Sequence, residues 1–234
     1  DFNAEPTGQV NAATARRSPG SALKPFIYLL ALESGWIIPE TMLDDGPVVL
    51  PDYRPENFDQ RFSAPLPARQ ALTHSHNTPA VRIVGRLSPA RLLAILRAVG
   101  MRSLDRSADY YGLTLALGGG EVTLLELTNA YAGLARGGDF RPCRITTREK
   151  QDDDRQPAAT RPFSPGSVQL LADMLATYPL PGSPTVPLAW KTGTSNGFRD
   201  AWCIAFNRDY TIGVWLGNKN GRPAASLVGV EAAA

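Results

Sequence analysis

Cysteine is scarce in this 234-residue chain, which has only Cys143 and Cys203. Two cysteines so far apart fit neither the paired spacing of a zinc site nor a C-x-x-C redox motif. Two buried free thiols are the favoured interpretation, because unpaired cysteine is often buried, and a single disulfide is the alternative. The cysteines therefore give no indication of a metal centre.

Lysine is also scarce. The 24 basic residues include only Lys24, Lys150, Lys191 and Lys219, which leaves 20 arginines. With 22 acidic residues the net charge is only +2. A charge so close to zero gives no electrostatic reason to expect nucleic acid as a partner. The scarcity of lysine also gives weight to any motif that requires one.

Long apolar runs are missing too. No stretch has the length of a membrane-spanning helix or the make-up of a signal peptide. The chain begins at Asp1 rather than at methionine. Its last residues, 231–234, read Glu-Ala-Ala-Ala, which is typical of the beginning of a helix. We therefore expect the sequence to be a fragment of a longer protein.

The order of the predicted elements indicates an α+β fold. Periodicity and capping signals predict helices at 21–34, 123–136 and 164–178, and several helical pieces within 66–100. Three short runs rich in β-branched and aromatic residues predict an antiparallel meander at 188–195, 201–206 and 210–216. The tryptophans of the meander, at 190, 202 and 215, are expected to pack in the core or on the sheet. Helices followed by hairpin strands are typical of one α+β domain with an antiparallel sheet.

The first candidate functional motif is S-x-x-K, at Ser21 and Lys24. Residues three apart on a helix share a face, so an amine lies beside a hydroxyl. Serine is a poor nucleophile until a base takes its proton, and lysine is that base only when its pKa is lowered. Alone the motif is weak, because a solvated helix face with serine and lysine gives the same spacing.

Two further motifs lie downstream. An S-x-N at Ser75 and Asn77 is expected in a tight turn; alone it is typical of any turn. A K-T-G-T at 191–194 lies in the first strand of the meander. Glycine inside a strand often marks a close approach to the backbone, and a cation with two hydroxyls suits a carboxylate ligand. This third motif is the hardest to explain as ordinary structure.

The three motifs together are far more specific than any one of them. S-x-x-K, S-x-N and K-T-G, in that order, are the signature set of the penicillin-recognising serine enzymes. Two of the four lysines, Lys24 and Lys191, occupy the two positions that require one. The sequences around both lysines, and the stretch 53–59, resemble those of the class A penicillin-binding proteins. The resemblance extends over nearly the whole chain and is greatest to the 1C type.

This resemblance implies a single transpeptidase domain over 1–234. Its mostly helical part, about 19–180, carries the first two motifs, and its β-meander, about 185–220, carries the third. The implied fold is an antiparallel sheet flanked by helices, with an all-helical lobe beside it and the active site in the cleft between them. Family members have further strands before the position of Asp1 and a closing helix after Val230. We therefore expect a truncated version whose last strand has an exposed edge.

The resemblance also implies the function of a peptidoglycan D,D-transpeptidase. The serine of the first motif attacks the carbonyl between the two terminal D-alanines of a stem peptide, and an amine of a second stem peptide resolves the acyl-enzyme. The expected catalytic residues are Ser21, Lys24, Ser75 and Lys191, and the expected substrate-binding residues are Asn77, Thr192, Gly193 and Thr194. Backbone N–H groups of Ser21 and Thr194 are expected to form the oxyanion hole.

Further expectations follow from the same resemblance. β-Lactam antibiotics acylate the same serine, D,D-carboxypeptidase activity is a side reaction, and no metal or organic cofactor is implied. The full-length chain is expected to carry a glycosyltransferase domain. It is also expected to be periplasmic or otherwise extracytoplasmic, and tethered to the membrane.

Three alternatives stay open. A serine β-lactamase shares all three motifs but needs a group that deacylates the enzyme; the nearby candidates are Glu121 and Glu126, and a capping box already explains Glu126. A non-catalytic penicillin-binding sensor or interaction module acylates without turning over. A Ser-His-Asp hydrolase is suggested by His74 and His76 on either side of Ser75, although a triad histidine usually comes from elsewhere in the fold. Either histidine is therefore expected to be a turn or cleft-wall residue.

Overall fold

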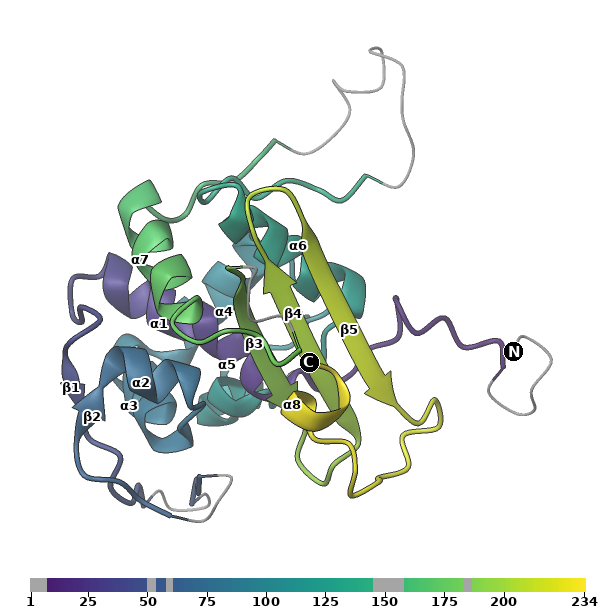
Figure 1. Ribbon diagram of the computed structural model, residues 1–234, viewed down its shortest axis with the longest axis horizontal. Helices are drawn as coiled ribbons and strands as arrows, with labels where there is room; N and C mark the ends of the chain where they lie inside the picture. The colour runs from purple at the N-terminus through teal and green to yellow at the C-terminus, as the bar shows by residue number, and fades with distance from the viewer. Residues whose placement is uncertain (1–7, 50–53, 58–60, 145–157, 183–186) are drawn as a thin grey trace.

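In the computed structural model, most of the helices pack against one face of a three-stranded sheet (Figure 1). The structure describes residues 8–49, 54–57, 61–144, 158–182 and 187–234. The elements run in the order η1 (Gly20–Leu23), α1 (Lys24–Glu33), β1 (Met42–Leu43), β2 (Leu66–Pro67), α2 (Ala68–Thr73), α3 (Asn77–Leu87), α4 (Pro89–Ala98), α5 (Ala108–Tyr111), η2 (Gly112–Leu117), α6 (Leu124–Ala135), α7 (Pro165–Leu175), β3 (Ala189–Thr194), β4 (Asp200–Phe206), β5 (Thr211–Gly217) and α8 (Gly229–Ala232). The predicted α+β class is confirmed.

Helix α1 forms the centre of the core. Every residue from Lys24 to Leu32 is buried, and a helix that is apolar on all sides requires cover from other elements. Helices α3 and α7 pack against it. At its beginning the hydroxyl of Tyr131, on α6, donates to the carbonyl of Ala22 at 2.7 Å, and the Tyr131 ring meets Phe26 edge to face. These contacts fix the turn that leads into α1.

The main sheet has the strand order β3-β4-β5 and is antiparallel throughout. Strand β4 is buried along its whole length. Helix α6 covers one face of β4 and β5, and α8 lies across the other face, in front of the sheet in Figure 1. In the part of the chain that the structure describes, β5 pairs only with β4, and Ile212 is 61% exposed. The expected exposed edge is therefore present.

Local signals in the sequence set most of the helix boundaries. Thr123 and Glu126 form the predicted capping box at the start of α6. Ser88 caps α4 through the N–H of Arg91, with Pro89 at the first position. The helical pieces predicted within 66–100 are α2, α3 and α4. The first two residues of this range form a strand with 42–43 instead. None of the helices in the described ranges is both long and apolar enough to cross a membrane.

Candidate active site

The candidate nucleophile Ser21 lies in η1, a single 3-10 turn that leads directly into α1. The turn begins at Gly20, whose φ of +51° favours glycine, and a side chain there would collide with the carbonyl of Thr194 on β3. The helical stretch predicted at 21–34 is therefore present, and it begins as a 3-10 turn before it continues as α1. Residues three apart in a 3-10 turn lie one above the other, so Ser21 and Lys24 still share a side.

The amine of Lys24 connects the first motif to the second. Its side chain is completely buried. The Nζ atom donates to the carbonyl oxygen of Ser75 at 2.5 Å and to Oδ1 of Asn77 at 2.6 Å, and it lies 3.4 Å from the Ser75 hydroxyl oxygen. None of these three acceptors is a carboxylate, so the buried amine has no hydrogen-bonded anion as its partner.

Ser75 occupies a strained turn between α2 and α3. Its φ of +64° is uncommon for a residue other than glycine. The turn is closed by a hydrogen bond from the N–H of Ser75 to the carbonyl of Leu72 at 3.1 Å, and Asn77 is the first residue of α3. The predicted tight turn is confirmed. Strain of this kind persists only where the surroundings impose it, and it concentrates at functional sites.

Lys191 of the third motif reaches the same hydroxyl from β3. This lysine is 3% exposed, and its Nζ donates to Ser75 Oγ and to the carbonyl of Thr192, both at 2.9 Å. The Ser75 hydroxyl therefore lies between the amines of Lys24 and Lys191. The structure brings together residues that are more than a hundred positions apart in the sequence, from α1, the α2–α3 turn and β3.

Both lysines titrate abnormally. Burial lowers the pKa of Lys24 well below the usual lysine value, and the positive charge of Lys191 lowers it further, whereas the carboxylate of Asp45 raises it. Burial also lowers the pKa of Lys191, to about 7. Each amine is consequently able to lose its proton at a pH where an exposed lysine remains charged. A neutral lysine beside a hydroxyl is suited to act as a general base.

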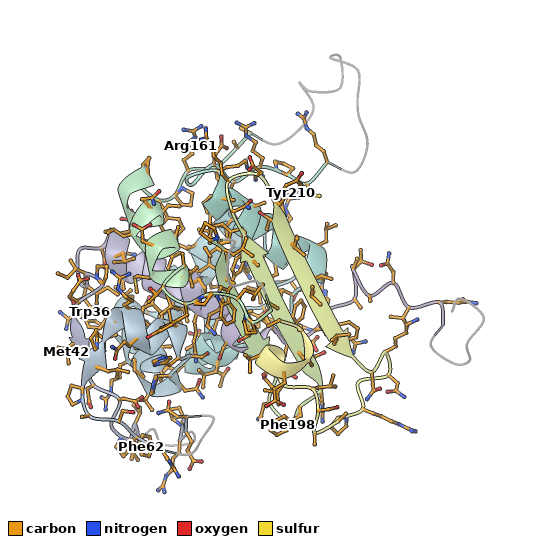
Figure 2. The ribbon with its side chains drawn as sticks, in the orientation of Figure 1. Trp36, Met42, Phe62, Arg161, Phe198 and Tyr210 are labelled. Carbon is orange, nitrogen blue, oxygen red and sulfur yellow. The ribbon has the colours of Figure 1, made fainter. Side chains whose placement is uncertain are left out.

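A cleft of about 1260 Å³ contains the three motifs. Of the predicted site residues it is lined by Ser21, Ser75, Asn77, Lys191, Thr192, Gly193 and Thr194. Lys24 lies buried beneath its surface. Strand β3 forms one wall with the edge that is not paired to β4, so its backbone is available to a ligand. Figure 2 shows Phe198 at the β3–β4 turn, at one end of this wall.

Gly193 allows β3 to approach the nucleophile turn. A side chain at this position would collide with the carbonyl of Pro19 and with the backbone of Ala22. Another group does therefore approach the backbone at Gly193, as predicted, and that group is the turn η1 of the same chain. The next residue, Thr194, accepts a hydrogen bond at Oγ1 from the N–H of Gly229 at 3.0 Å. Its hydroxyl proton remains available to donate.

A buried carboxylate that was not predicted lies behind the second motif. Asp45 is completely buried, and its carboxylate contacts the side chains of Asn57, Thr78 and His76 and the N–H of Ser63. Burial raises the pKa of Asp45, but the hydrogen bonds outweigh this effect and hold it below its usual value. Asn57 in turn accepts from the N–H of Asn77 at 2.7 Å. This network positions the beginning of α3. The only indication of this network in the sequence was the family resemblance of the stretch 53–59, which includes Asn57.

The histidines do not form a catalytic triad with Ser75. His76 Nδ1 lies 2.9 Å from the carboxylate of Asp45. His74 stacks on Tyr178, with ring centroids 5.4 Å apart. The hydroxyl of Ser75 is bonded to lysine instead. Both histidines line the cleft, as predicted.

The two candidate deacylating glutamates differ in their surroundings. Glu126 is held in the capping box by the N–H of Thr123 at 3.1 Å, and it also accepts from the N–H of Ser103 at 3.0 Å. Glu121 is exposed and lines the cleft. A β-lactamase interpretation therefore rests on Glu121.

The remaining expectations concern cysteine, tryptophan and metal. Cys143 and Cys203 are both free, as favoured, and Cys203 is buried. The expectation that both are buried is wrong for Cys143, which is exposed because it lies in an irregular segment outside the core. Trp202 is fully buried, whereas Trp190 also lines the cleft. Within the described residues no cluster of three or more histidine, cysteine or acidic side chains is arranged to hold a metal.

Solved structures define the class of fold. PonA1 from Mycobacterium tuberculosis in complex with penicillin V superposes with a TM-score of 0.79 at 20% identity, over 94% of this chain and 67% of that one. Penicillin-binding protein 1A from Haemophilus influenzae superposes with a TM-score of 0.77 at 23% identity, over 95% of this chain and 42% of that one. The chain has the fold of the penicillin-binding transpeptidases.

Sequence comparison then identifies the family. Residues 3–220 match the penicillin binding protein transpeptidase domain, and the chain belongs to this family. Penicillin-binding protein 1C of Escherichia coli K12 is 41% identical over 232 residues, 97% of this chain and 29% of that protein. Penicillin-binding protein 1A of Neisseria meningitidis Z2491 is 31% identical over 230 residues, 88% of this chain and 28% of that protein. The predicted resemblance to the 1C type is confirmed, and the chain spans less than a third of each of these relatives.

Proposed function

We propose that this chain is a D,D-transpeptidase domain that forms an acyl-enzyme at Ser21 from D-Ala-D-Ala stem peptides. The observation that carries the proposal is the Ser75 hydroxyl, which lies 2.9 Å from the Nζ of Lys191 and 3.4 Å from that of Lys24, in the cleft that Ser21 lines. Two amines of lowered pKa around one hydroxyl form a path for protons. Peptide acyl transfer requires such a path between the nucleophile and the departing amine.

Each proposed step is assigned to a group that lines the cleft or lies just beneath its surface. Lys24, with its lowered pKa, takes the proton of Ser21 as the hydroxyl oxygen attacks the peptide carbonyl. The bond to the terminal D-alanine breaks, and Ser75, supported by Lys191, delivers a proton to the departing amine. The backbone N–H groups of Ser21 and Thr194 stabilise the oxyanion, which is commonly a large contribution to the rate. An amine from a second stem peptide then takes the acyl group.

Substrate contacts are assigned to the walls of the cleft. Asn77 holds the substrate backbone through its side-chain amide. Thr192 and Thr194 hold the terminal carboxylate, since the hydroxyl of Thr194 accepts from Gly229 and keeps its own proton to donate. Gly193 contributes its backbone and the close packing that it permits.

The proposal extends to ligands and to the full-length protein. PonA1, which shares the fold, has been solved in complex with penicillin V, and we expect β-lactams to acylate Ser21 in the same cleft. From the likeness to penicillin-binding proteins 1C and 1A, we expect the full-length protein to carry a glycosyltransferase domain and a membrane anchor. We also expect it to act in the periplasm.

The direct test is covalent labelling with a fluorescent penicillin. Ser21→Ala is expected to abolish labelling, because no other group supplies the attacking oxygen. Ser226→Ala serves as the matched control, since Ser226 is exposed and does not line the cleft. Undiminished labelling of Ser21→Ala would end the assignment.

The β-lactamase alternative is tested on the unaltered chain. A transpeptidase is expected to release product from nitrocefin in one stoichiometric burst. Continuous turnover that is lost in Glu121→Gln would establish a β-lactamase, with the exposed Glu121 as its deacylating group.

A further inference from the structure

Three aromatic side chains from different elements line the cleft. His74, at the end of α2, stacks on Tyr178, which follows α7, with an interplanar angle of 25°. The indole N–H of Trp190, on β3, donates to the carbonyl of Tyr178 at 2.8 Å and so ties this segment to the strand. All three residues line the cleft, and Tyr178 is 41% exposed. These residues, His74, Tyr178 and Trp190, are called the aromatic wall below.

The aromatic wall shares the cleft with the groups that are proposed to transfer protons. His74 directly precedes Ser75 in the chain. Trp190 lies on the same face of β3 as Thr192, because side chains two apart on a strand point the same way. Three elements therefore place ring surface in the cleft that contains the 2.9 Å hydrogen bond between Lys191 Nζ and Ser75 Oγ. The catalytic steps of the proposed function do not use this surface.

The direction of the substrate along β3 follows from the proposed function, on which this inference rests. The acyl carbonyl lies at the N–H of Thr194, and the terminal carboxylate is held by the threonine hydroxyls, including that of Thr192. The departing residue therefore extends back along β3 toward Trp190. The amine that replaces it has to enter through the same space, which the aromatic wall borders.

We propose that the aromatic wall is the acceptor subsite and that it binds the aliphatic chain which carries the acceptor amine. Ring faces pack well against methylene groups and exclude water. An amine presented on such a chain loses hydration as it enters, which favours its neutral, nucleophilic form. Water is the competing nucleophile, so its exclusion directs the acyl group to the amine.

The covalent step balances without any further reactant. The neutral amine nitrogen forms a bond to the acyl carbon, and the ester bond from that carbon to Ser21 Oγ breaks. The proton released by the amine passes through Ser75 and the neighbouring lysines to Ser21 Oγ, which restores the hydroxyl. The products are an amide and the free enzyme.

The partition of the acyl-enzyme between amine and water tests the subsite. The chain is supplied with an acyl-D-alanyl thioester as donor and with Nα-acetyl-lysine, a primary amine on four methylene groups, as acceptor. Tyr178→Ala is expected to lower the ratio of aminolysis to hydrolysis about tenfold, the loss that follows from exposing one or two methylene groups. With methylamine, which has no chain, the ratio is expected to fall less than twofold.

Two further variants make the outcome decisive. Tyr178→Phe keeps the ring and is expected to retain the ratio. Tyr210→Ala removes a tyrosine that is 73% exposed at the β4–β5 turn (Figure 2) and does not line the cleft, so it is expected to behave as the unaltered chain. An equal ratio in Tyr178→Ala and the unaltered chain, or equal losses with both amines, would overturn the subsite. If the unaltered chain forms no acyl-enzyme, the proposed function itself fails.

Discussion

Lys24 and Lys191 give the site its chemistry at the scale of single residues. Burying a lysine disfavours its charged form, and here two buried amines face one hydroxyl. The neighbouring acceptors are carbonyl, amide and hydroxyl oxygens rather than carboxylates. The lowered pKa values are therefore a property of the packing, and they favour the neutral amine at a pH where an exposed lysine is a cation.

Removing Lys191 tests this electrostatic coupling. In Lys191→Met the charge that lowers the pKa of Lys24 is lost, so the pKa of Lys24 rises. In the proposed mechanism acylation requires neutral Lys24, so the pH at which the acylation rate begins to rise is expected to shift upward. Loss of the proton path also slows acylation at pH 7 about 100-fold or more. The measurement is the second-order rate constant of penicillin acylation as a function of pH.

Lys219→Met provides the control for Lys191→Met. It makes the same change in net charge at a lysine that does not line the cleft. It is therefore expected to leave the pH dependence of the acylation rate unchanged. A rate profile of Lys191→Met that stays at the same pH, or moves to lower pH, would contradict the coupling.

The sequence identified the motif residues but not all of their partners. Ser21, Lys24 and Lys191 were predictable because their spacing and order are specific. Asp45 was not, because it lies in a loop without periodicity, where an acidic residue is ordinarily solvated. Only the three-dimensional arrangement shows that four groups donate to, or lie against, its buried carboxylate.

At the scale of elements, the site depends on how closely η1 lies against β3. Gly193 faces Pro19, and Gly20 faces Thr194, with no room for a side chain at either glycine. Two elements that pack through backbone alone are held in a narrow range of distances. This contact sets the position of Ser21 relative to the strand that is proposed to bind substrate.

Gly193→Ala is expected to damage activity more than stability. The added methyl group collides with the carbonyl of Pro19, and overpacking of this kind costs about 1–3 kcal/mol of unfolding free energy. The same collision is expected to push η1 away from β3 and so to displace Ser21. A displacement of about 1 Å is expected to slow acylation up to about 100-fold. Thermal unfolding and acylation rate, measured on the same samples, separate the two effects.

Gly166→Ala is the matched control for Gly193→Ala. Gly166 lies in α7 with open space around it, so alanine there is expected to be neutral or slightly stabilising. If Gly193→Ala acylates as fast as the control, the close packing does not position the nucleophile.

The strands were easier to predict than the nucleophile turn. Short runs of β-branched and aromatic residues gave β3, β4 and β5 to within a residue or two. The 3-10 geometry of η1 was not predictable from a local pattern, because this turn packs closely against β3, which lies more than 160 residues later in the chain. A local pattern cannot report a contact of that separation.

At the scale of the whole molecule, one face and one edge of the sheet are incompletely covered. Ile212 and Leu216 on β5 are 61% and 43% exposed, and within the described residues this strand pairs on one side only. An exposed apolar edge is a template for association with another chain. This arrangement agrees with the exposed edge that the sequence predicts for the last strand.

Ile212→Lys is expected to reduce self-association of this chain. A lysine on an edge strand opposes edge-to-edge pairing by charge repulsion. Sedimentation velocity over a range of protein concentrations measures this self-association. The unfolding temperature is expected to change little, because the side chain of Ile212 is already exposed. Val10→Lys, which adds the same charge at an exposed position away from the sheet, is expected to leave association unchanged. Equal association of both variants would show that β5 is not the contact.

Mass spectrometry after incubation with benzylpenicillin tests the central claim most directly. The intact chain is expected to gain the mass of one drug molecule, and peptide mapping is expected to place it on Ser21. That result requires an assembled cleft, with Lys24, Ser75 and Lys191 in contact as the structure has them. A chain that gains no mass, or that carries the drug on a residue other than Ser21, would contradict the account.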